Sequence, residues 1–189
     1  MKMAPLRKYQ LTALLTLSGC VGSHSPLTRE ILDEQSGNTL IVVSTPLEFA
    51  RARTDVAAHA RDYATLVAVE IDQAGSYSDF LLLYRWSTVD RRMSPPPDPD
   101  QGELHILADG RDIDLEPLAD LPISLAKREE LYVPPHGDLV AHAYRADGPT
   151  LRYIASSRQL IVRLPRERLD TPFALFRDGR KALADFAGQ

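Results

Sequence analysis

The residues best suited to chemistry in this chain lie in the segment His136-Gly-Asp138-Leu-Val-Ala-His142. Two imidazoles and one carboxylate could hold a metal ion or carry out acid–base catalysis. On a strand, however, His142 shares a face with Val140 and Tyr144, whereas His136 belongs to the turn before that strand. The spacing does not bring the three groups to one centre. We therefore expect no metal site and no cofactor here.

Several other catalytic signatures are absent from the sequence. It contains no Gly-x-Ser-x-Gly segment, no His-Glu-x-x-His segment and no glycine loop that would hold a phosphate. Because catalysis needs convergent polar groups at one site, we expect a protein that is not an enzyme.

The first twenty residues carry a more specific pattern. Lys2, Arg7 and Lys8 precede a short apolar run, and small residues then lead to Cys20, the only cysteine. This order is typical of a secretory signal, with a charged region, an apolar region and a cleavage site. The apolar run is much shorter than the roughly 20 residues of a transmembrane helix. We expect residues 1–19 to be a signal peptide.

The segment Leu17-Ser18-Gly19-Cys20 resembles the lipobox of bacterial lipoproteins, which their signal peptidase recognises. The resemblance implies that Cys20 carries acyl chains such as palmitate and becomes the first residue after cleavage. Each methylene buried in a bilayer contributes about 0.8 kcal/mol, so several chains give stable attachment. Because Val21 follows the cysteine in place of aspartate, the resemblance also implies a lipid-anchored location at the outer membrane, facing the periplasm.

Composition restricts the partners of the remaining 170 residues. Cleavage after residue 19 removes three of the 22 basic residues and none of the 26 acidic ones, so the net charge becomes −7. A negative surface argues against nucleic acid and against general adhesion to anionic lipid. With Cys20 acylated no thiol remains, which excludes disulfides and cysteine-ligated metals.

The mature chain divides into a tether over residues 20–37 and one β-rich domain over residues 38–189. Within the tether, Ser25-Pro26 is a helix start signal, and Leu27 and Ile31 follow at helical spacing. This part is either a short docked helix or a polar spacer. Beyond it, a buried strand is expected over residues 40–43, and another over residues 47–53 before a helical turn.

The clearest element is a long hairpin over residues 64–89, in which apolar residues occupy both faces of the second strand, as in a central strand. A second hairpin turns at Asp109-Gly110. After a connection over residues 116–137, strands are expected at 139–145, 151–155, 160–164 and 172–176, with a turn at 147–149, and a terminal helix follows Asp178-Gly179. The fold class is mainly β: an antiparallel β-sandwich or partly open barrel with a short C-terminal helix.

Four residues are candidates for contact with a partner or ligand. Tyr84 and Trp86 belong to an aromatic stripe on the long hairpin, which either lines a pocket or belongs to the core. Arg91 and Arg92 follow that strand and either meet an anionic group or are solvated.

These observations predict a membrane-anchored lipoprotein that acts as a non-catalytic binding or assembly module. Its partner would be another envelope protein or a small apolar ligand, and the bilayer would hold it through Cys20. The alternative is a periplasmic hydrolase or metal-dependent enzyme that uses His136, Asp138 and His142.

Overall fold

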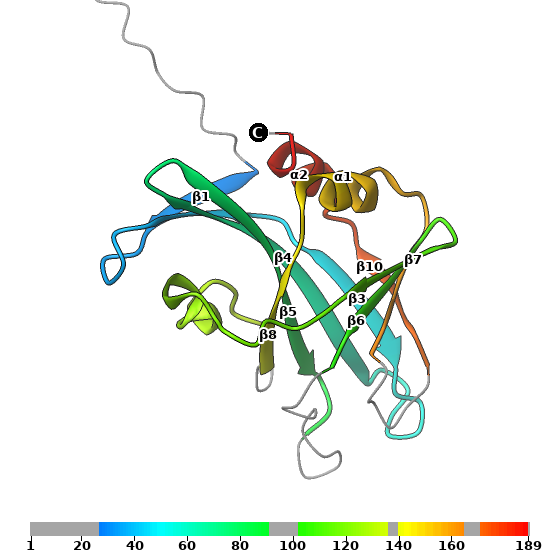
Figure 1. The fold of residues 1–189 in the computed structure, drawn as a ribbon. Coiled ribbons are helices and arrows are strands. Elements are labelled where there is room, and N and C mark those ends of the chain that lie inside the picture. Colours follow the sequence, from blue (N-terminus) through cyan, green and yellow to red (C-terminus); the bar gives the residue numbers. More distant parts are fainter. Residues whose placement is uncertain (1–26, 91–101, 136–139, 165–170, 189) are drawn as a thin grey trace, which may run out of the picture.

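Ten strands form one antiparallel sheet in the computed structural model of the chain, which describes residues 27–90, 102–135, 140–164 and 171–188 (Figure 1). Two α-helices lie together at one end of the sheet. The mainly β class with a short C-terminal helix is thus confirmed. The strands are β1 (Thr28–Leu32), β2 (Thr39–Val43), β3 (Leu47–Ala52), β4 (Arg61–Gln73), β5 (Ser76–Ser87), β6 (Leu104–Ala108), β7 (Arg111–Leu115), β8 (Val140–Arg145), β9 (Leu160–Arg163) and β10 (Phe173–Arg177). The helices are α1 (Gly148–Ser156) and α2 (Arg180–Phe186), and the 3-10 turns are η1 (Ile123–Leu125) and η2 (Arg128–Glu130).

The hairpin β4–β5 is the central element of the sheet. One edge of β4 pairs with β3 over its first half and with β2 over its second half, while β5 covers the other edge along its whole length. The sheet continues from β5 to β8, and from β3 through β10, β9 and β6 to β7. After β7 the chain returns to β8, where Leu118 N donates to Ala143 O at 2.9 Å and Pro117 bridges Tyr144. The curved sheet is therefore almost closed on itself.

Both faces of the β4–β5 hairpin are buried, as the two apolar faces of its sequence predict. Residues 80–86 of β5 are all buried, and helix α2 adds Ala182, Leu183 and Phe186 to the same core. Helix α2 can start where it does because residue 179 is glycine. A Cβ there would lie 2.4 Å from the backbone oxygen of Pro46, well inside contact distance.

Two of the expected elements are wrong. Residues 28–32 form an edge strand on β2, not a helix or spacer, and Ile31 of this strand and Leu27 just before it pack against the core. Residues 151–155 form part of helix α1 and not a strand. The Asp147 carboxylate accepts a hydrogen bond from Thr150 N at 2.8 Å and caps that helix, with proline in its first turn.

The two ends of the sheet differ in what they present. Strand β1 begins beside α2 and the C-terminus, so the described chain enters at the helical end (Figure 1). The opposite end, here called the far end, is made by Ala52, Arg61 and Ser87, which end or begin their strands. Register places them together, because Ala52 pairs with Arg61 and Asp62 with Ser87.

Candidate functional site

An aromatic pair lies on the outer face of the far end. Tyr63 and Trp86 are direct cross-strand neighbours, and their rings are stacked with centroids 3.9 Å apart and planes 4° apart. Trp86 Nε1 donates to Thr65 Oγ1 at 3.1 Å. Both rings are nearly buried and, with Ala50, form a small apolar cluster separate from the main core. The indole N–H is therefore already satisfied within the sheet.

Phe176 and Arg61 extend this aromatic pair toward solvent. The Phe176 ring packs edge-on against Tyr63, with centroids 5.6 Å apart, and is 51% exposed. The Arg61 guanidinium lies over the Phe176 ring at 5.3 Å. The site therefore shows an exposed ring and cation above a buried aromatic base.

A buried carboxylate lies next to the aromatic pair. Glu48 is opposite Thr65 in the sheet and only 4% exposed. Its Oε1 is 3.3 Å from Arg177 Nη1 and accepts a long hydrogen bond of 3.5 Å from Tyr132 Oη. Burial raises the pKa of the Tyr132 phenol, opposed by its hydrogen bond with Thr65. The phenol thus remains protonated at neutral pH and can donate to Glu48.

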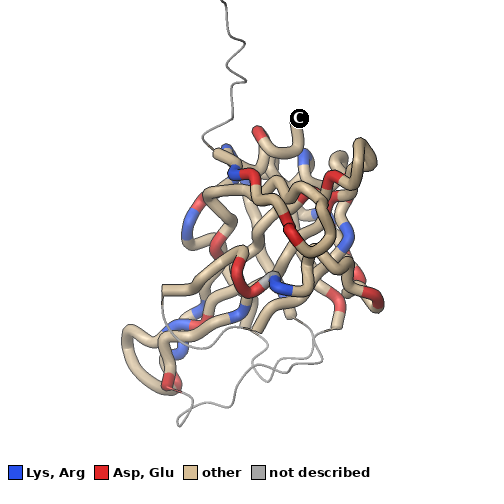
Figure 2. The backbone as a smooth tube through the Cα atoms, turned by 90° about the vertical axis from the view of Figure 1, so that its left-hand side faces the viewer, with Lys and Arg blue, Asp and Glu red and all other residues tan. Residues whose placement is uncertain are grey.

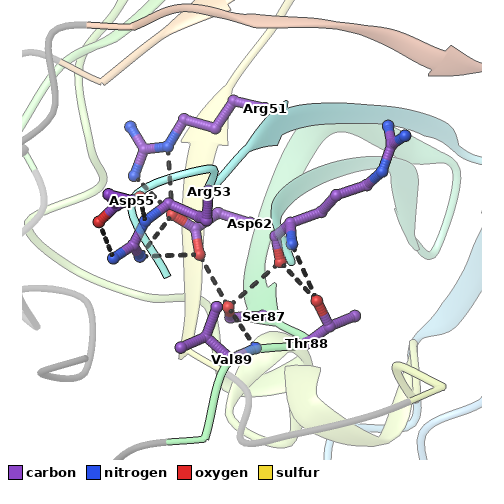
Figure 3. Close-up of polar contacts among 8 residues, drawn as sticks. Arg51, Arg53, Asp55, Asp62, Ser87, Thr88 and Val89 are labelled. Atoms are coloured by element: carbon purple, nitrogen blue, oxygen red, sulfur yellow. Dashed lines mark hydrogen bonds and ion pairs between the residues drawn. The ribbon is translucent and has the colours of Figure 1, made fainter. Parts of the chain in front are cut away.

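The opposite face of the same strand ends carries a charged cluster (Figure 3). Asp62 Oδ2 accepts from Arg51 Nη2 at 2.9 Å and from Arg53 Nη1 at 3.2 Å, while Asp62 Oδ1 accepts from Ser87 Oγ at 2.7 Å. Asp55 binds the outer side of Arg53 through two contacts of 3.0 Å, which raise the pKa of that guanidinium. Since both oxygens of Asp62 accept charged or hydroxyl donors, this carboxylate is poorly suited to act as a general base.

The candidate contact residues have different surroundings. Tyr84 is completely buried, with its ring centroid 5.1 Å from that of Tyr132, whereas Trp86 forms the base of the outer aromatic site. Arg91 and Arg92 lie outside the described residues, as do Cys20 and the segment Leu17-Ser18-Gly19.

Of the three residues in the histidine hypothesis, His142 is the one that lies in the described part of the chain. His142 lies in β8 opposite Leu83 and is half-buried, while His136 and Asp138 lie outside the described residues. Across the described ranges, no group of three His, Cys, Asp or Glu side chains is arranged to hold a metal ion. The described part of the chain also contains no helix that is long and apolar enough to cross a membrane.

Sequence reasoning did not single out the Ser-x-x-Lys motif or the contact between Phe176 and Tyr63. Ser124 and Lys127 have the Ser-x-x-Lys spacing of some acyl-transfer enzymes, yet no hydrogen bond joins them among the described contacts. Ser124 Oγ instead lies 2.8 Å from Ser36 Oγ and 2.9 Å from Asn38 Nδ2, which fixes η1 to the turn between β1 and β2. Phe176 was missed as well, because no local signal places it beside Tyr63.

Charge is mixed over the described chain, with basic and acidic positions interspersed (Figure 2). Comparison with known proteins adds no family to this description: no family model, curated protein or solved structure matches the chain.

Proposed function

We propose that the protein is a bacterial envelope lipoprotein whose β-domain acts as a non-catalytic binding or assembly module. The observation that carries this proposal is the segment Leu17-Ser18-Gly19-Cys20, placed directly after a charged and then an apolar region. Acylated Cys20 would hold the domain at the outer membrane, facing the periplasm.

The length of the connection supports a role close to the bilayer. Six residues lie between Cys20 and Leu27, the first described residue, so seven residue steps join them. A chain of that length spans at most about 25 Å in any conformation. The helical end of the domain would thus stay near the membrane, with the far end on the opposite side of the domain.

A binding role is also favoured by the chemistry of the far end. The Asp62 carboxylate is occupied by Arg51, Arg53 and Ser87, which suits it to holding strands together. The exposed groups on the other face of these strand ends are an aromatic ring and guanidinium groups, and these suit recognition better than proton transfer.

The Cys20→Ser variant tests the anchor. In bacteria fed a radioactive fatty acid, we expect the wild type to be labelled and the variant to remain an unlabelled precursor of greater mass. Ser25→Ala, which leaves the lipobox intact, should be labelled like the wild type. Undiminished label on Cys20→Ser would refute lipid attachment at this residue.

A further inference from the structure

Five side chains, three exposed and two nearly buried, form a connected cluster on the outer face of the far end. Tyr63 stacks on Trp86, Phe176 packs against Tyr63, Arg61 lies over Phe176, and Arg177 pairs with the Glu48 carboxylate beside Trp86. We call Arg61, Tyr63, Trp86, Phe176 and Arg177 the far-end patch. Its members come from β4, β5 and β10, so only the folded sheet assembles them.

An irregularity in β10 is what exposes the patch. Leu175 pairs with Phe49, but Arg177 pairs with the adjacent Glu48, so the register shifts between them and Phe176 becomes the extra residue. A β-bulge of this kind redirects side chains that regular alternation would send to opposite faces. Here both Phe176 and Arg177 contact residues of the outer face, and both are more than half exposed at their side chains.

The patch has the composition of a recognition surface. Tryptophan, tyrosine, phenylalanine and arginine are the residue types enriched in protein interfaces, and the energetically dominant contacts are buried aromatic and arginine anchors. Rigid backing reduces the entropy lost on binding, and the stacked Tyr63–Trp86 pair supplies it for Phe176. Arg61, Arg177 and the Glu48 carboxylate that Arg177 contacts leave the patch with one net positive charge.

We propose that the far-end patch binds an acidic segment with apolar side chains on a second envelope protein. This inference rests on the proposed binding function and specifies its partner. Carboxylates of that segment would pair with Arg61 and Arg177, and an apolar side chain would pack on Phe176. A protein is favoured over an anionic lipid surface because the far end lies on the side of the domain opposite the helical end, where the proposed anchor joins.

The test uses the only tryptophan of the chain, Trp86, as a local reporter. The full-length chain, purified in a non-ionic detergent, is titrated with a synthetic peptide of alternating glutamate and leucine while Trp86 fluorescence is recorded. We expect saturable binding, and about tenfold weaker binding by the double variant Arg61→Ser/Phe176→Ser. A peptide with lysine in place of glutamate should not bind.

A matched control replaces one arginine and one aromatic residue outside the far-end patch. Tyr77 is an exposed aromatic residue, and the exposed Arg111 lies over the Tyr153 ring at 5.0 Å. Arg111→Ser/Tyr77→Ser should bind the acidic peptide as the wild type does. Equal weakening in both double variants, equal binding of the lysine peptide, or no saturable binding would overturn the proposal.

Vesicles of phosphatidylglycerol provide a further arm of this experiment. The proposal expects no competition with the peptide, whereas displacement of the peptide by vesicles would assign the patch to lipid and overturn it. Because the titration does not depend on acylation, its failure can be distinguished from failure of the Cys20 assignment.

Discussion

The two ends of the hairpin β4–β5 surround their carboxylates with opposite kinds of neighbour. At the far end, Asp62 lies opposite Ser87 and receives the guanidinium groups of Arg51 and Arg53. Toward the turn, Glu70 lies directly opposite Asp79, and no hydrogen bond or ion pair to the Glu70 carboxylate occurs among the described contacts. Like charges placed directly opposite each other in a sheet are destabilising.

The pKa shifts follow this difference. Burial raises the pKa of Glu70, with further increases from Asp79 and Asp72. Burial also raises the pKa of Asp79, as does Asp147, while Arg152 opposes the change. One hairpin therefore combines an end fixed by opposite charges with an end that loses stability to like charges. The first of these joins β4 to β5, the strands that carry three residues of the far-end patch.

Replacing Asp62 should have the largest effect. Asp62→Ala leaves two nearly buried guanidinium groups without this carboxylate, and breaking a buried ion pair in this way costs about 3 kcal/mol or more of the free energy of unfolding. Urea unfolding followed by Trp86 fluorescence measures the loss. Asp112→Ala, at an exposed position of β7, should change stability by less than about 0.5 kcal/mol. Similar small losses in both variants would mean that the charged cluster does not fix the far end.

A smaller effect is expected at the turn of the same hairpin. Gly75 has φ +89°, and its N–H donates to the Asp72 carboxylate at 2.7 Å. Gly75→Ala forces a side chain into the left-handed region and should cost about 1 kcal/mol. Gly148→Ala, where the backbone is not in that region and the nearest atoms are the movable end of Arg152, should cost less. Equal urea midpoints for wild type and Gly75→Ala would contradict this account of the turn.

The smallest change in stability is expected at the like-charge pair Glu70–Asp79. Here removing one charge should stabilise the protein, whereas the two variants above destabilise it. The folded pKa values of Glu70 and Asp79 lie above their unfolded values, so the folded protein binds protons first as the pH falls. Their contribution to stability therefore rises from pH 7 toward about pH 5. At pH 7, Glu70→Gln should stabilise the protein by about 0.5 kcal/mol.

The difference in stability between the wild type and Glu70→Gln reports on the pair Glu70–Asp79 alone, because all other titrating groups are the same in both proteins. The advantage of Glu70→Gln over the wild type should shrink as the pH is lowered, and urea midpoints at pH 7 and pH 5 measure it. An advantage that is constant with pH would show that the gain does not come from charge.

Local sequence patterns were sufficient to predict the two hairpins but not every other element. The alternation along residues 64–89 and the Asp109-Gly110 turn each specify a hairpin within one short segment, and both hairpins are present. Helix α1 was mistaken for a strand because Leu151, Tyr153 and Ala155 also alternate. The capping contact of Asp147 with Thr150 and the stripe of Leu151 and Ile154 were the signals for a helix.

The candidate site shows where such patterns stop being informative. Trp86 could be singled out as part of an aromatic stripe, although its sequence context does not reveal the stacked partner. Phe176 and Arg61 meet because β10 pairs with β3, which in turn pairs with β4, and because of a bulge in β10. Contacts between segments so distant along the chain leave no trace in local spacing.

The position of α2 ties two distant parts of the sequence together. Gly179, directly before this helix, lies so close to the backbone oxygens of Thr45 and Pro46 that no side chain would fit there. The helix itself contributes Ala182, Leu183 and Phe186 to the main core. Deleting residues 180–188 would therefore uncover apolar side chains of the sheet, although every strand would remain in place.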